Sequence, residues 1–176
     1  MLGHEDSAAS YRRSLSEKKE LLIIKCLNAQ SLLCHFDAIE FMLHQENIDI
    51  LCICETWLDS SIDNKFIKIS KFNVIRYDAG RGSGACIYIR EDLNFSVIDT
   101  GVDKLEGVED VWIQVQHRKF PSFITGCVYR HPKALVASFQ YMSDVFRNIC
   151  LKNMPVFILG DMNDDLLVKI IRNQNL

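Results

Sequence analysis

The chain has 176 residues, of which 48% are hydrophobic and 24% charged, as in one globular domain or a large part of one. Its net charge of −3, from 20 basic and 23 acidic residues, excludes a protein held on nucleic acid by bulk charge alone. The sequence has neither the roughly 18-residue apolar run of a membrane span nor an apolar secretory core, so we expect an intracellular protein, nuclear or cytoplasmic, that is not secreted.

The first third of the chain predicts a leader and then a strand–helix–strand unit. Residues 1–20 are polar and predict a flexible leader. Residues 21–29, LLIIKCLNA, have the length and apolar character of a strand, and residues 31–47 place apolar side chains at helical spacing. Residues 48–56, IDILCICET, are apolar on both faces, which is typical of a strand covered on both sides. We therefore expect a parallel strand pair with a right-handed crossover.

The middle of the chain predicts consecutive short strands, and the last third returns to a helix and a strand. The expected strands of the middle part are residues 71–78, 85–92, 94–99, 109–116 and 122–130, with a glycine-rich turn, AGRGSG, at residues 79–84. Strands that follow one another so closely predict an antiparallel meander. Residues 134–151 restore the helical period, and residues 156–161, VFILGD, predict a last strand. This order predicts an α/β sandwich of mixed β-sheets flanked by helices.

The seven cysteines indicate free thiols. Without a secretion signal we expect a reducing compartment, in which disulfides are rare. Cys52 and Cys54 alternate along one expected strand, and no C-x-x-C pair occurs, so the sequence gives little support to a zinc site. We expect most of these cysteines to be small hydrophobic residues of the core.

Polar side chains stand at the downstream ends of three expected strands. They are Asn28, Glu55 and Asp161. Ligands of open α/β sheets collect at the carboxyl ends of strands, and two carboxylates with an amide offer the hard oxygen ligands that Mg²⁺ prefers. Each residue also has a purely structural interpretation, since Glu55 could pair with a lysine or arginine and Asp161 could begin a turn.

The stretch YRHPK, residues 129–133, is a second group of polar residues. Tyr129 and Arg130 could donate hydrogen bonds to an anionic oxygen, as in a phosphate clamp, and His131 could titrate near neutral pH. The structural alternative is a strand end, at which Pro132 interrupts the pairing before the next helix.

Five motifs in the same order resemble the endonuclease/exonuclease/phosphatase superfamily. The motifs are LNAQSL, DILCICETWL, GRGSGACIYIRED, VYRHP and VFILGDMND, and the resemblance runs from about residue 21 to residue 168. More narrowly, the sequence is similar to the endonuclease domain of non-LTR (LINE-type) retrotransposons of the chicken-repeat-one and jockey kind. The resemblance implies a DNase I-like sandwich, of which this chain carries the N-terminal part.

The resemblance also implies a role for each residue that matches a motif. Glu55 would be the main ligand of Mg²⁺, with Mn²⁺ as a substitute, and Asn28 would contact the metal or the phosphate. Tyr129 would donate a hydrogen bond to the scissile phosphate, Asp161 would orient or deprotonate the attacking water, and Asn163 would hold a phosphate oxygen. The implied partner is DNA, cut to leave a 3′ hydroxyl that primes a reverse transcriptase belonging to a longer product.

The sequence departs from the family pattern in two places. GDMN stands where GDFN is usual, a mild exchange of one apolar residue for another. The family also has a later Ser-Asp-His segment that supplies the histidine of the active site, and none of the five histidines here stands in such a segment. We therefore expect residues 21–176 to be a partial domain with impaired activity. The alternatives are a non-catalytic remnant or interaction module of a retroelement, and a phosphatase or repair nuclease of the same superfamily.

Overall fold

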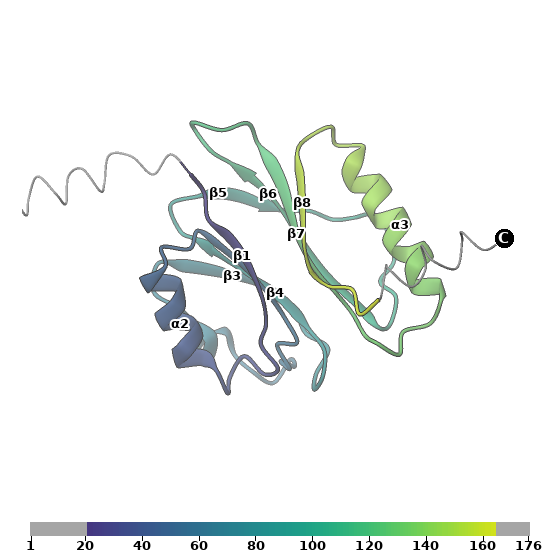
Figure 1. The fold of residues 1–176 in the computed structure, drawn as a ribbon, viewed down its shortest axis with the longest axis horizontal. Coiled ribbons are helices and arrows are strands. Elements are labelled where there is room, and N and C mark those ends of the chain that lie inside the picture. Colours follow the sequence, from purple (N-terminus) through teal and green to yellow (C-terminus); the bar gives the residue numbers. More distant parts are fainter. Residues whose placement is uncertain (1–20, 165–176) are drawn as a thin grey trace, which may run out of the picture.

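The computed structural model describes residues 21–164 as two four-stranded sheets packed face to face, with one helix on each outer side (Figure 1). This arrangement confirms the predicted α/β sandwich. The strands are β1 (Ile24–Asn28), β2 (Ile50–Cys54), β3 (Phe72–Tyr77), β4 (Ala85–Arg90), β5 (Asn94–Val97), β6 (Val108–Gln116), β7 (Phe123–Arg130) and β8 (Val156–Asp161). The helices are α2 (Phe36–Gln45), α3 (Ala137–Cys150) and the short 3₁₀ helix η1 (Asn64–Ile67). The predicted leader, residues 1–20, lies outside the described residues.

The first sheet has the strand order β1-β2-β4-β3 and contains the predicted strand–helix–strand unit. β1 and β2 pair in parallel, with Asn28 opposite Cys54, and α2 connects them. All five residues of β2 are buried, as expected for a strand covered on both faces. α2 begins at Phe36, later than the apolar spacing predicted, because residues 32–35 form a turn.

The second sheet has the order β5-β6-β7-β8, and its last pair is parallel, with Tyr129 opposite Asp161. The prediction of one continuous antiparallel meander is therefore wrong at one point, since β4 and β5 belong to different sheets. β4 lies between β2 and β3, so both of its hydrogen-bonding edges are occupied and the chain crosses to the other sheet.

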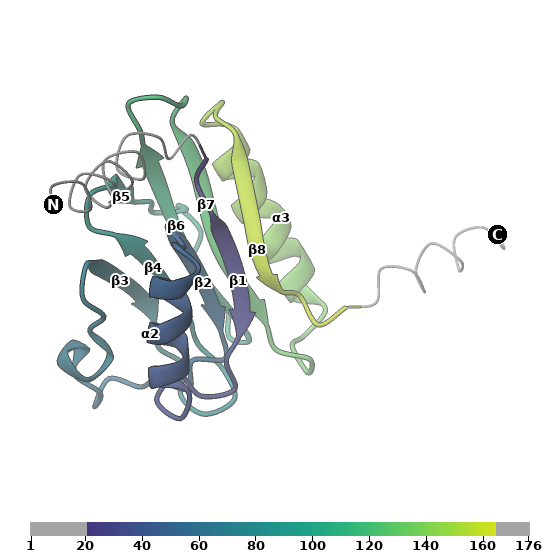
Figure 2. The ribbon, with the colours of Figure 1, turned by 60° about the vertical axis from the view of Figure 1, so that its left-hand side comes forward.

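Three apolar clusters hold the four layers together. One lies between α2 and the first sheet, one between the two sheets, and one between the second sheet and α3. Four of the seven cysteines are buried in these layers, which confirms most of the thiols as core residues: Cys52, Cys54, Cys86 and Cys127. Across the central layer β1 and β8 face each other, and both run toward the same end of the sandwich (Figure 2). None of the helices in residues 21–164 is long and apolar enough to cross a membrane.

Candidate active site

The side-chain amide of Asn28 connects two carboxylates that come from different sheets. Its Nδ2 donates to Glu55 Oε1 at 2.8 Å and to Asp161 Oδ2 at 3.3 Å. The Asn28 Oδ1 in turn accepts from the Gln30 backbone N–H at 3.3 Å. Asn28 ends β1, Glu55 directly follows β2, and Asp161 ends β8. The structure thus brings together the three polar strand ends that the sequence singled out, although 133 residues separate Asn28 from Asp161.

Two of the site residues have a left-handed backbone, which non-glycine residues rarely adopt. The φ angle of Glu55 is 51° and that of Asn163 is 44°. Such conformations cost roughly 1–3 kcal/mol each and concentrate at functional sites. The Asn163 backbone N–H donates to Asp161 Oδ1 at 3.0 Å, and its side-chain amide donates to the Arg130 carbonyl at 2.8 Å. Asn163 is therefore fixed directly beside Asp161.

Gly160 lets β8 approach β7 closely enough to place Asp161 in the site. A Cβ atom at Gly160 would lie 1.7 Å from the carbonyl oxygen of Val128, a distance no side chain can tolerate. This explains the glycine of the GDMN motif, because the next residue must reach the group of polar side chains opposite Tyr129.

Tyr129 contributes a buried hydroxyl. The residue is 2% exposed, and its hydroxyl donates to the Gly82 carbonyl at 3.2 Å. Burial, followed by the negative charge of Glu55 nearby, raises the pKa of Tyr129 to about 12. The phenol therefore stays protonated at neutral pH and remains a hydrogen-bond donor.

Arg130 and His131 lie differently from the phosphate clamp that the sequence suggested. The Arg130 guanidinium donates to Ser138 Oγ at 2.7 Å, to the Ala134 carbonyl at 3.1 Å and to the Asn163 carbonyl at 3.4 Å. With an exposure of only 6%, it holds the start of α3 and the segment of Asn163 in place instead of pointing at solvent. The His131 Nδ1 accepts a hydrogen bond from the Lys133 backbone N–H. The His131 side chain is half-buried and lines a cavity.

Glu109 is a site residue that sequence reasoning missed. It lies on β6 directly opposite Tyr129, is 4% exposed, and its Oε2 has no hydrogen-bond partner. Burial raises the pKa of this carboxyl to about 7, and a backbone hydrogen bond with Gly84 only partly opposes the shift. A signal was present in the sequence, because Glu109 shares the inward face of β6 with Val111 and Ile113.

The sequence of this sandwich also matches a known family. Residues 27–167 match the profile of the Endonuclease/Exonuclease/phosphatase family. The chain belongs to this family. No curated protein matches the sequence.

Several solved structures share the sandwich of this family member. An AP endonuclease from Archaeoglobus fulgidus has 17% identity and a TM-score of 0.57, covering 81% of this chain and 58% of its own. The Neisseria 3′ phosphatase NExo, bound to a product DNA hairpin, has 15% identity and a TM-score of 0.55. The match covers 81% of this chain and 58% of the phosphatase. D. rerio TDP2, complexed with single-strand DNA product, has 13% identity and a TM-score of 0.55. The match covers 86% of this chain and 64% of the TDP2 chain. This family member thus spans between 58% and 64% of the length of these three structures.

The donor set of this family member fits a hard divalent cation. Glu55 and Asp161 offer two carboxylates at one point, and the Asn28 side chain donates its Nδ2 to both while its Oδ1 accepts from Gln30. Within residues 21–164 no three His, Cys, Asp or Glu side chains are grouped closely enough to hold a metal ion by themselves. This composition fits Mg²⁺, which is usually bound through one or two carboxylates and completes its shell with water and substrate phosphate.

Proposed function

We propose that this chain hydrolyses phosphodiester bonds of DNA with the help of Mg²⁺, as a nicking endonuclease of the non-LTR retrotransposon type. The observation that carries the proposal is the Asn28 amide, which gathers Glu55 and Asp161 from opposite sheets into one oxygen-rich site. The retrotransposon assignment is supported by the motifs of the sequence, ETWL at residues 55–58 above all.

In this proposal Glu55 and Asn28 would hold the metal, which would supply positive charge to the phosphate and to the leaving oxygen. Asp161 accepts a proton from the attacking water or orients it, since its carboxylate lies at the end of β8 beside the metal ligands. Tyr129, still protonated at neutral pH, donates to a phosphate oxygen in place of the Gly82 carbonyl.

Asn163 would hold a second phosphate oxygen. Its side-chain amide now donates to the Arg130 carbonyl, and its backbone N–H to Asp161. Arg130 acts as a positioning residue, because its guanidinium binds the Asn163 carbonyl and the start of α3.

DNA as the substrate is supported by relatives of the same fold. The Neisseria phosphatase and D. rerio TDP2 were both solved with DNA products bound. The net charge of −3 requires that DNA binding come from the site and its local surroundings, not from overall charge.

Nicking of supercoiled plasmid by the full 176-residue chain tests this function, in Mg²⁺ and in EDTA, beside Asp161→Asn. We expect relaxation that requires Mg²⁺ and falls by at least about 100-fold in the variant, the scale of a lost general base. Asp103→Asn, at an exposed loop position, is the matched control and should nick at the wild-type rate.

The other outcomes separate the alternatives. A folded chain that nicks no faster than Asp161→Asn would be a non-catalytic remnant. A chain that releases phosphate from a 3′-phosphorylated oligonucleotide but leaves the plasmid intact would be a phosphatase.

A further inference from the structure

A cavity of about 790 Å³ adjoins the proposed site on the side of Tyr129. Its walls include Tyr77, Asp78, Leu105, Glu109, His131 and Leu135. Two contacts connect it with the site. Glu109 lies directly opposite Tyr129, and the Tyr129 hydroxyl donates to Gly82, whose neighbour Ser83 also lines the cavity. The volume falls within the roughly 300–1,000 Å³ of small-ligand sites in proteins.

Glu109 is the feature of this cavity that the fold leaves unexplained. It is 4% exposed, its Oε2 has no partner, and no cation pairs with it in the described part of the chain. The Gly84 backbone hydrogen bond leaves this oxygen unsatisfied, and a buried carboxyl oxygen without a donor costs free energy that a well-packed fold would normally avoid.

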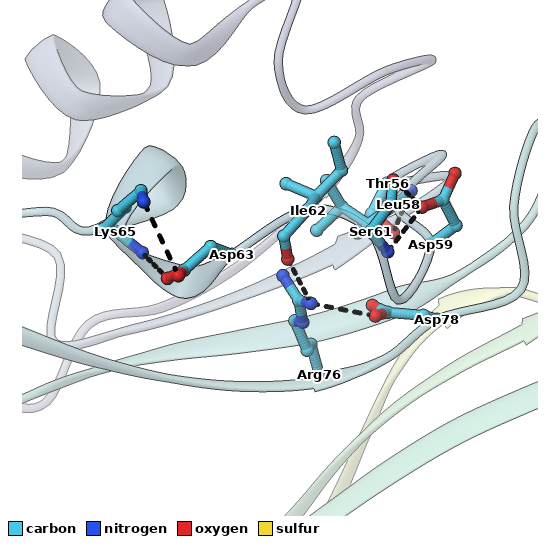
Figure 3. Close-up of polar contacts among 9 residues, drawn as sticks. All are labelled: Thr56, Leu58, Asp59, Ser61, Ile62, Asp63, Lys65, Arg76 and Asp78. Atoms are coloured by element: carbon cyan, nitrogen blue, oxygen red, sulfur yellow. Dashed lines mark hydrogen bonds and ion pairs between the residues drawn. The ribbon is translucent and has the colours of Figure 1, made fainter.

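Asp78 differs from Glu109, because Arg76 neutralises it at 3.0 Å (Figure 3). The Arg76 guanidinium also donates a hydrogen bond to the Ile62 carbonyl at 2.6 Å, which fixes the position of the Arg76–Asp78 ion pair in the cavity wall. One oxygen of each acid, Asp78 Oδ1 and Glu109 Oε2, has no hydrogen-bond partner, but among the described residues only Asp78 has a neutralising cation beside it.

The other walls suit a flat and mainly apolar group. Tyr77 presents an aromatic ring, and Leu105 and Leu135 add aliphatic surface. Leu135 is 73% exposed, so its side chain is open to a bound group at the rim of the cavity. Lys133 and His131 also line the cavity, but a phosphate has no N–H to donate to Glu109, so the part of DNA that suits this carboxyl is a base.

We propose that this cavity binds one base next to the scissile phosphate, and that the carboxyl of Glu109 selects guanine, which has two adjacent donors, over thymine. The inference rests on the proposed function, since it assigns the substrate of the same site more narrowly. An amino group of guanine, adenine or cytosine supplies the missing donor, and guanine adds its neighbouring ring N–H. Thymine offers Glu109 only its ring N3–H, one donor where guanine presents an amino group and a ring N–H side by side.

Binding of deoxyguanosine 5′-monophosphate and thymidine 5′-monophosphate by the full chain tests the inference in EDTA, without any cleavage. The readout is the NMR shift of the backbone amides of Gly107 and Ala134, which line the cavity. We expect the guanine nucleotide to bind at least about fivefold more tightly, and Glu109→Gln to lose most of this preference. Glu106→Gln, an exposed acid of the same cavity, is the matched control and should keep it.

Equal affinity for the two nucleotides, or a preference that survives in Glu109→Gln, would overturn the inference. The wild-type comparison stands even if Glu109→Gln fails to fold. If the chain nicks plasmid but does not prefer the guanine nucleotide, only the inference about the cavity is wrong. If it prefers the guanine nucleotide but does not nick plasmid, only the proposed function is wrong.

Discussion

Asn28 is the residue on which the geometry of the site depends. Its amide donates to both carboxylates, so it compensates for the repulsion between two negative charges at the ends of two sheets. Sequence position alone could mark Asn28 as a strand-end residue, but not as the group that bridges the two acids.

We predict that Asn28→Ala lowers the free energy of unfolding by about 1–2 kcal/mol, because two hydrogen bonds to charged groups are lost in a solvent-exposed setting. Nicking should fall far more steeply than stability, by about 100-fold. Urea unfolding and plasmid nicking measure the two effects, with the exposed Asn94→Ala as control. A variant that keeps wild-type nicking would show that the amide only supports the fold.

Glu109 predicts a specific pH dependence of stability. Burial raises its pKa from an ordinary 4.5 to about 7, so the folded protein holds more protons than the unfolded chain between these values. The stability contributed by neutral Glu109 is fully present below the ordinary pKa and is lost as the pH rises through about 7. Relative to Glu109→Gln, the wild-type free energy of unfolding should drop by about 2–3 kcal/mol between pH 5 and pH 8. Parallel urea-unfolding profiles of the two proteins would contradict this assignment.

At the scale of the element, β8 matters because it carries Asp161 and packs tightly against β7. Gly160→Ala would place a methyl group 1.7 Å from the Val128 carbonyl and push the two strands apart. We predict a loss of about 2–3 kcal/mol from this overpacking, together with loss of nicking.

Gly80→Ala provides the matched control for this change. Gly80 also has a positive φ, of 77°, but a Cβ there meets nothing within 4 Å. It should cost only about 1 kcal/mol of backbone strain. Equal losses in urea unfolding for the two variants would show that close approach to β7 is not what Gly160 provides.

The elements themselves were largely predictable from the sequence. The expected strand at residues 156–161 coincides with β8, and every expected strand is present, because apolar alternation and glycine-rich turns are local signals. The pairing of β4 with β2 was not predictable, since it depends on which strand edges are already occupied. The hydrogen-bond partners of Arg130 were not predictable for a similar reason, because Ser138 and Asn163 come from later parts of the chain.

At the scale of the whole molecule, the sandwich has an apolar edge far from the site. A second cavity, of about 660 Å³, lies at the amino ends of β1, β7 and β8, and is lined mainly by apolar residues such as Leu22, Phe123 and Phe157. It lies at the opposite end of the strands from Asn28 and Asp161, so it has no part in the proposed chemistry.

The outer edge of β8 predicts self-association at high concentration. Phe157 is 47% and Ile158 40% exposed, and in the described part of the chain no strand pairs beyond β8. We expect Ile158→Lys to lower the weight-average mass measured by sedimentation equilibrium. Val97→Lys, at an exposed position of β5, should leave it unchanged. An unchanged mass in Ile158→Lys would show that this edge is not where copies meet.

Direct binding of Mn²⁺, followed by the loss of its free electron paramagnetic resonance signal, tests the central claim that Glu55 and Asn28 hold a metal ion beside Asp161. Mn²⁺ replaces Mg²⁺ at hard oxygen ligands and reports binding without any reaction. We predict one bound Mn²⁺ per chain, weakened at least about tenfold by Glu55→Gln and unaffected by Glu106→Gln. Equal binding by wild type and Glu55→Gln would contradict the account.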